Sequence, residues 1–240
     1  MSSAERGRRG VLIIGIVGLV LVVALAIAVG FIMNSFNDRA PTSSHPAASL
    51  VAREYLDAIA SGDGDRAREL DARVLEGDRY SSRDVTTFVS TAALSAAVER
   101  ISDISVDDVS STEKEAAVDY SFTLAGESYE GRFNLLWDAT TEQWMLDSSL
   151  AQTLIVSTFV DDRLDSERPP FTLGPVAAGV HDEQSNDIGL GSAVYPGVYQ
   201  FDVDIDPASL RDAGAIAVSQ QLVVPPGVQL VELEYQLLAE

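Results

Sequence analysis

An uninterrupted apolar segment near the start of the chain constrains the fold more than any other feature. Residues Val11 to Met33 have the sequence VLIIGIVGLVLVVALAIAVGFIM, without a charged or strongly polar side chain. At about 1.5 Å per residue these 23 residues would form a helix about 34 Å long, enough to cross a hydrocarbon core of about 30 Å. The sequence therefore predicts a transmembrane helix at 11–33, so the folded part must build its core from other residues.

The charges beside this segment predict the orientation in which it crosses the membrane. Arg6, Arg8 and Arg9 precede it, whereas residues 34–38 carry no positive charge. Because positively charged flanks stay on the cytoplasmic side, residues 1–10 are predicted to be a basic cytoplasmic tail. The expected location is the cell membrane, with a single crossing, the N-terminus inside and the bulk of the chain extracytoplasmic.

A cleaved signal peptide is the alternative interpretation of the same segment. Small residues at Ala24, Ala26 and Ala28 offer a cleavage site. The apolar part of a signal peptide is usually only about 7–15 residues long, which favours an uncleaved signal anchor.

Composition restricts the chemistry of the exported part. After Arg39 the chain contains 35 Asp and Glu against 12 Arg and Lys, a formal charge of −23. Such a surface repels nucleic acids and anionic lipid headgroups, so no nucleic acid partner is expected. The chain has no cysteine, which excludes disulfides, thiol nucleophiles and thiolate metal sites.

Helical patterning begins after a short spacer. Residues 34–47, rich in Pro, Ser and Thr, are predicted to separate the membrane from the folded part. Apolar side chains then recur at helical spacing from Ala48 to Ile59, with Ser49 as a candidate N-cap. A third, alanine-rich helix is predicted over 84–99.

The stretch SGDGD (61–65) separates two helical patterns. Gly62 can adopt the left-handed conformation that ends a helix, and either aspartate of the stretch can cap the next one. An EF-hand calcium loop starting at Asp63 would need Gly at its sixth position and Glu at its twelfth, where this chain has Arg68 and Val74. The stretch therefore predicts a corner between helices. The second helix would bury Ala67, Leu70 and Val74.

The periodicity then changes from helical to strand-like. Apolar and polar residues alternate over 118–124, 129–137 and 144–146, with turn signals between them, and 104–109 fits a preceding strand. Such a succession predicts an antiparallel meander with one buried face. Helices followed by this sheet make the region 48–149 an α+β domain.

Two stretches of this region carry a family resemblance. They are YLDAIASGDGDRARELD, residues 55–71, and EQWMLDSS at the end of the meander. The region resembles the cone-shaped α+β superfamily that includes nuclear transport factor two, ketosteroid isomerase and the small lumazine-binding-like domains. It is especially similar to membrane-anchored versions found outside actinobacterial cells. The resemblance implies a cone-like fold of helices on a curved antiparallel sheet.

The resemblance implies little about activity, because the superfamily hosts enzymes, transport factors and inert modules alike. Ketosteroid-isomerase-like relatives use a first-helix Tyr as an oxyanion donor and a pocket Asp as a base. Tyr55 is the matching Tyr in this chain, although ordinary packing explains its place on the apolar stripe equally well. Asp119 alternates away from the apolar face of its strand, so a base has no obvious position.

Residues 150–240 are predicted to be a second, all-β domain. Apolar and polar residues alternate over 199–205 and 231–237, and turn signals rich in Pro and Gly punctuate the region. This spacing favours a small β-sandwich-like domain. Whether residues 150–164 belong to its sheet or to that of the first domain stays open.

Catalytic and metal-binding candidates are few. The only histidines are His45 in the spacer and His181 in a loop, and no G-x-S-x-G, phosphate-loop or H-E-x-x-H motif occurs. Asp202, Asp204 and Asp206 would share one strand face, as a solvated face or as a weak calcium site. No catalytic residue, metal or cofactor is predicted.

Without a convergent polar constellation, the sequence favours a noncatalytic binding or accessory module, tethered by residues 11–33 and directed at a cell-envelope protein or glycan. The alternative is a small-molecule carrier or enzyme that uses the cone pocket. Another hypothesis assigns recognition to exposed aromatic residues of the second domain, such as Tyr195 or Tyr199. The candidate pocket lining of the carrier hypothesis is Tyr55, Tyr120, Phe122, Phe133, Trp137 and Trp144.

Overall fold

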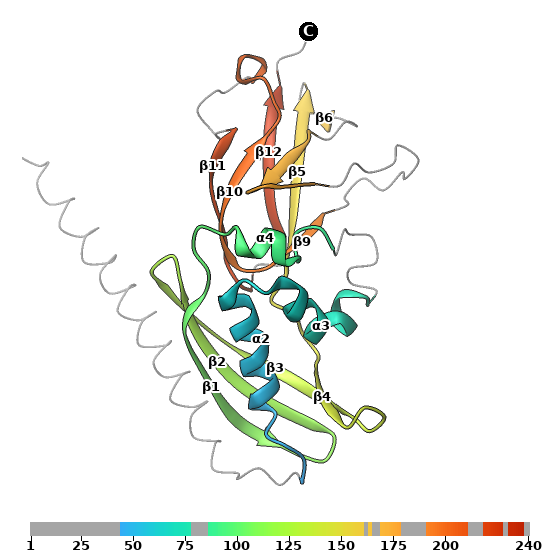
Figure 1. The fold of residues 1–240 in the computed structure, drawn as a ribbon. Coiled ribbons are helices and arrows are strands. Elements are labelled where there is room, and N and C mark those ends of the chain that lie inside the picture. The colour runs from blue at the N-terminus through green and yellow to red at the C-terminus, as the bar shows by residue number, and fades with distance from the viewer. Residues whose placement is uncertain are drawn as a thin grey trace, which may run out of the picture.

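The chain folds as an α+β protein in which a few helices pack on antiparallel sheets (Figure 1). The predicted membrane span at 11–33 lies outside the described residues, and within the described ranges no helix is both long and apolar enough to cross a membrane. The structure is a computed structural model that describes residues 44–77, 86–160, 163–164, 169–178, 191–210, 218–227 and 230–237.

The described residues from Ser44 to Ser149 form what we call the helical half. Its four-stranded sheet has the order β1-β2-β3-β4, with every pair antiparallel. Helix α2 packs against β1 and β4, and α3 packs against β4. The elements are α2 (Ser49–Ser61), α3 (Gly64–Leu75), α4 (Thr91–Ser95), β1 (Ser102–Ser111), β2 (Glu115–Leu124), β3 (Glu127–Asp138) and β4 (Gln143–Leu146).

The meander predicted from the alternating pattern is confirmed, but the third helix is much shorter than predicted. Of the described residues in 84–99, only α4 is α-helical. The side chain of Ser90 accepts a hydrogen bond from Ala93 N and so caps a helix that begins only at Thr91. At the other end, Glu99 forms an antiparallel β-bridge with Val198, which is far along the chain. The backbone of Glu99 is therefore not helical.

Helix α2 begins without the predicted Ser cap. Its N-cap residue is Ala48, which has no side-chain capping bond. Instead, the N–H and Oγ of Ser49 donate to the Asp108 carboxylate on β1, at 3.0 and 2.5 Å. A negative charge from the sheet therefore satisfies the helix N-terminus, where the helix dipole favours an anion.

The described residues from Leu150 to Leu237 form the strand half. One sheet has the order β11-β10-β7-β8, and the other has the order β12-β5-β6 with β9 also paired to β5. All pairs are antiparallel except β5 and β12, which are parallel. The elements are β5 (Gln152–Val160), β6 (Arg163–Leu164), β7 (Phe171–Leu173), β8 (Val176–Ala177), β9 (Ser192–Val194), β10 (Gly197–Val203), the 3-10 turn η1 (Pro207–Ser209), β11 (Ser219–Val224) and β12 (Leu230–Leu237).

This pairing answers the question about residues 150–164. Strands β5 and β6 pair with each other, and β5 also pairs with β9 and β12, so they belong to the strand half. In Figure 1 the strand half lies beyond one end of the helical half, with α4 between the two.

The three aspartates of FDVDIDP do not share a strand face, so that prediction is wrong. β10 ends at Val203, before the second and third of them. Asp202 accepts a hydrogen bond from Ser219 Oγ, and Asp206 accepts from Ala208 N at 2.9 Å as the chain enters η1. No group of three or more His, Cys, Asp or Glu side chains among the described residues could hold a metal ion.

A single hydrophobic core runs through both halves. The halves are also joined by backbone hydrogen bonds, from Val98 N to Val198 O at 2.7 Å and from Val198 N to Glu99 O at 2.8 Å. Arg100 donates to the carbonyls of Ala60 at 3.0 Å and Ser95 at 3.2 Å, near the C-terminal ends of α2 and α4. A cation suits these two helix ends, because both carry partial negative charge.

Candidate functional site

The predicted pocket residues divide into two groups inside the helical half. In the first, the ring centroids of Tyr55 and Phe133 lie 5.7 Å apart, and those of Tyr120 and Phe133 lie 4.3 Å apart. Phe122 lies 5.9 Å from Tyr120. All but the half-buried Tyr120 are fully buried, so these rings contact one another in the core. That they line a ligand pocket stays a prediction.

The second group contacts the first of the described residues. The His45 ring stacks on Trp137 with centroids 3.5 Å apart, and its Nε2 lies 3.1 Å from a Glu113 carboxylate oxygen. Ser44 also donates to Glu113, from its N–H at 3.1 Å and its Oγ at 3.2 Å. Trp144 donates from Nε1 to the Pro46 carbonyl at 2.8 Å. We call Ser44, His45, Pro46, Glu113, Trp137 and Trp144 the N-terminal clasp.

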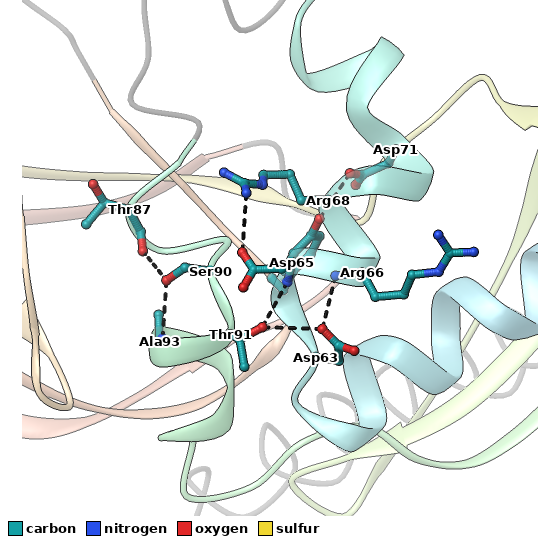
Figure 2. Close-up of polar contacts among 10 residues, drawn as sticks. Asp63, Asp65, Arg66, Arg68, Asp71, Thr87, Ser90, Thr91 and Ala93 are labelled. Atoms are coloured by element: carbon teal, nitrogen blue, oxygen red, sulfur yellow. Dashed lines mark hydrogen bonds and ion pairs between the residues drawn. The ribbon is translucent and has the colours of Figure 1, made fainter.

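The helix corner predicted from SGDGD is confirmed (Figure 2). Gly62 ends α2 with a left-handed φ of 88°, and the Asp63 side chain accepts from Arg66 N at 3.1 Å as the N-cap of α3. Thr91 donates to Asp63 at 3.3 Å and accepts from the Asp65 N–H at 3.1 Å. The acidic residues therefore form a corner that also holds α4.

Gly64 permits the close approach of α4 to this corner. A Cβ atom added at Gly64 would lie 2.4 Å from the carbonyl carbon of Ser90, far inside normal contact distance. The second glycine of the stretch is thus required by packing rather than by a bound ion.

A hollow of about 280 Å³ lies along α3, beside this corner. Arg68, which contacts Asp65 at 3.3 Å, is the one basic residue among its lining residues. None of the six aromatic candidates lines this hollow. Its lining residues are Asp65, Arg68, Glu69, Ala72, Leu75, Glu76 and Thr86.

Asp71 is the residue of greatest chemical interest, and sequence analysis missed it. Helix α3 buries Ala67 as predicted, and Leu70 and Val74 pack against the core while partly buried, but the inward face also includes the fully buried Asp71 and Leu75. Asp71 is 0% exposed. Its spacing, four residues after Ala67 and four before Leu75, places it on the apolar stripe, and this was the available signal.

Three hydroxyl groups surround the Asp71 carboxylate. Tyr55 donates to Oδ2 at 2.8 Å, Ser149 donates to Oδ2 at 2.5 Å, and Tyr195 donates to Oδ1 at 3.0 Å. The Tyr55 hydroxyl accepts from Leu150 N at 2.9 Å, and the Ser149 hydroxyl accepts from Ala151 N at 2.9 Å. The carboxylate therefore binds α2, the connection between the halves, and the strand half at once.

Burial dominates the electrostatics of this network. Loss of water raises the pKa of Asp71 to about 6, although its three hydroxyl donors act in the opposite direction. Burial and the nearby carboxylate likewise raise the pKa values of Tyr55 and Tyr195 above the usual range. At neutral pH the network therefore contains an ionised Asp71 and neutral tyrosines.

The structure contradicts the hypothesis of exposed aromatic residues at Tyr195 and Tyr199. Both side chains are 0% exposed. The Tyr199 hydroxyl donates to the Tyr195 carbonyl at 2.9 Å, and the Tyr195 hydroxyl donates to Asp71. Each polar tip has a buried partner, which is why the β-rich region can enclose two tyrosines.

The other sequence-derived candidates have simpler places. Asp119 forms an exposed pair with Arg132, at 2.6 and 3.0 Å, which confirms that it points away from the buried face. His181 lies outside the described residues.

Comparisons with known proteins identify no relative. No protein-family model matches the chain, and no curated protein or solved structure matches it either.

Proposed function

We propose that this chain is a noncatalytic binding or accessory module, held outside the cell by a membrane helix at residues 11–33. In this proposal the helical half is a cone-like domain of the actinobacterial, membrane-anchored type. The strand half is a β-sandwich-like domain, and the partner is a cell-envelope protein or glycan. No cofactor is required.

The observation that carries the proposal is the position of the N-terminal clasp. The clasp attaches Ser44 and His45 to Glu113 and Trp137. The blue segment that leads into α2 lies at the end of the helical half away from the strand half (Figure 1). Residues 34–43 can reach at most about 35 Å when fully extended. An anchored chain would therefore keep the helical half near the membrane and present the strand half outward.

The state of Tyr55 and Asp71 supports a noncatalytic role. Both are fully buried, and both carboxylate oxygens of Asp71 already accept hydrogen bonds. The Tyr55 hydroxyl donates one bond and accepts another. A substrate oxygen could replace these partners only if the connection between the halves were displaced, since Leu150 supplies the bond that Tyr55 accepts.

Single cysteine substitutions test the topology, because the natural chain has none. Leu50→Cys near the clasp and Val223→Cys on β11 change residues that are 64% and 41% exposed. On intact cells, a membrane-impermeant maleimide should label both variants but leave Ser3→Cys unlabelled until lysis. A quencher attached to lipid headgroups should then reduce the fluorescence of the Leu50→Cys label more than that of Val223→Cys. Labelling of Ser3→Cys on intact cells would reject the proposed orientation.

A small-molecule carrier or enzyme is the second candidate. The observation in its favour is the 2.8 Å contact between a first-helix Tyr and a buried Asp, the residue pair that the family resemblance implies for isomerase-like relatives. Native mass spectrometry of the full chain in detergent distinguishes the two candidates. The accessory-module proposal expects the mass of the polypeptide alone. A stoichiometric small molecule whose retention is lost in Tyr55→Phe would favour the carrier.

A further inference from the structure

Asp71 connects parts of the chain that are far apart in sequence. Its partners Tyr55, Ser149 and Tyr195 are 16, 78 and 124 positions away. Tyr195 lies between β9 and β10, so the carboxylate binds the helical half to the strand half directly. Figure 2 shows Asp71 on α3, the helix that also begins at the Asp63 corner.

Among the described residues, none of the hydrogen-bond partners of this carboxylate carries a charge. Its three hydrogen-bond partners are hydroxyl groups that are neutral at physiological pH, two from tyrosine and one from serine. Arg68, which contacts Asp65 at 3.3 Å, acts on the network only through its electrostatic effect on Tyr195. An ionised carboxylate without a buried cation is costly, whereas a protonated one is neutral and can still form hydrogen bonds.

We propose that Asp71 is a proton-controlled lock between the two halves, strongest when its carboxyl group is protonated and weaker when it is ionised. Protonation requires little rearrangement. The new O–H of Asp71 can donate to the Tyr195 or Ser149 oxygen once that hydroxyl rotates, and the other two hydroxyls can continue to donate to Asp71. Mild acid would therefore hold the halves together more firmly, opposite to the effect that paired surface carboxylates produce.

The direction follows from proton linkage. Asp71 has a folded-state pKa of about 6 against an ordinary value of 3.8, so the folded state binds the proton more tightly than the unfolded state. Its contribution is fully present below pH 3.8 and is lost as the pH rises through about 6. A shift of this size corresponds to roughly a 100-fold change in the folding equilibrium constant.

The tyrosines that bond to Asp71 do not titrate in this window. Burial raises the pKa values of Tyr55 from α2 and Tyr195 from the strand half above their ordinary range. Strand β4, which packs on α3, has no ionisable side chain, and Ser149 of the connection between the halves has none either. The transition near pH 6 therefore belongs to the carboxyl group.

The test compares urea unfolding of the full chain in detergent between pH 4.5 and 8. The wild type should lose about 30-fold in its folding equilibrium constant relative to Asp71→Asn across this range, because pH 4.5 lies above the ordinary pKa of 3.8 and so captures only part of the full effect. The comparison is needed because acid also lowers the repulsion within a chain of charge −21, which affects both proteins equally. A wild-type pH dependence that matches that of Asp71→Asn overturns the proposal.

A titration of the Asp71 carboxyl carbon by NMR keeps the proposal testable if Asp71→Asn does not fold. Tyr195→Phe removes a donor that favours the ionised form, so the midpoint should rise above the wild-type value of about 6. Tyr199→Phe removes an equally buried hydroxyl that bonds a backbone carbonyl instead, and should leave the midpoint unchanged. A wild-type titration midpoint near 4, or equal changes of the midpoint in the two variants, would overturn the proposal.

Discussion

Asp63 caps helix α3 and Asp71 lies in its middle, and the two aspartates have opposite environments. Asp63 is exposed and bonds to Arg66, three residues away, and to Thr91 of the adjoining helix. Asp71 is fully buried, and its most distant partner is 124 positions away. The same type of side chain can therefore define where a helix begins or join segments that are distant in sequence. Burial and the sequence distance of the partners decide which.

The first role was predictable from sequence, and the second was not. A glycine that ends a helix and an aspartate that caps the next act within a few residues, so SGDGD predicted Gly62 as the helix end and either Asp63 or Asp65 as the cap, of which Asp63 is the N-cap. The meander was likewise predictable because each strand shows its own alternation. The partners of Asp71 come from three segments whose proximity only the folded chain creates.

The predicted helix over 84–99 and the predicted Ser49 cap are wrong for the same reason, since distant partners decided both. The alanine-rich stretch before Glu99 favours a helix locally, but pairing with Val198 competes for its backbone. Ser49 has a good capping side chain, yet it donates to Asp108 from a neighbouring strand. In both cases a residue about 60 to 100 positions away overrides a local preference.

The largest effect is expected from Asp71→Ala. The substitution leaves two buried tyrosine hydroxyls and the partly buried Ser149 hydroxyl without their acceptor and opens space in the core, so we expect a loss of about 3–5 kcal/mol in the free energy of unfolding at pH 5. Urea denaturation of the full chain measures it. A loss below about 1 kcal/mol would mean that the network contributes little to the union of the halves.

A smaller loss, about 2 kcal/mol, is expected from Gly64→Val. The added side chain would press against the Ser90 backbone, which cannot yield as a flexible side chain would. The same denaturation experiment applies, with Gly77→Val as the control for β-branching, since φ at Gly77 is not in the left-handed region and a Cβ there would lie 3.3 Å or more from non-neighbouring atoms. A Gly64→Val protein no less stable than the control would show that α4 can move away from the corner.

The cap itself should contribute less than the packing beside it. Asp63→Ala removes the acceptor for Arg66 N, with an expected loss of about 1 kcal/mol. Asp65→Ala is the matched control, because its side chain contacts only the exposed Arg68 and it occupies the first turn of the same helix. Thermal unfolding followed by circular dichroism should separate the two variants. Equal losses would assign the effect to helix charge rather than to capping.

The smallest effect is expected at an exposed ion pair on α2. Asp57 contacts Arg53 at 3.0 Å, one helical turn away, and both side chains are about half exposed. Asp57→Asn should therefore change the free energy of unfolding by less than about 0.5 kcal/mol, and added salt should abolish the difference. A loss comparable to that of Asp63→Ala would contradict the view that burial, and the sequence distance of its partners, determine how much a carboxylate contributes to stability.

The parallel pairing of β5 with β12 imposes an order on biosynthesis. Seventy positions separate Val160, where β5 ends, from Leu230, where β12 begins, so β5 leaves the ribosome well before its long neighbour exists. The meander and its helices, by contrast, need only partners made within a short interval. Parallel strands distant in sequence pair slowly, because a large loop must close first. During synthesis, the edge of β5 that later pairs with β12 therefore stays unpaired until β12 has been made.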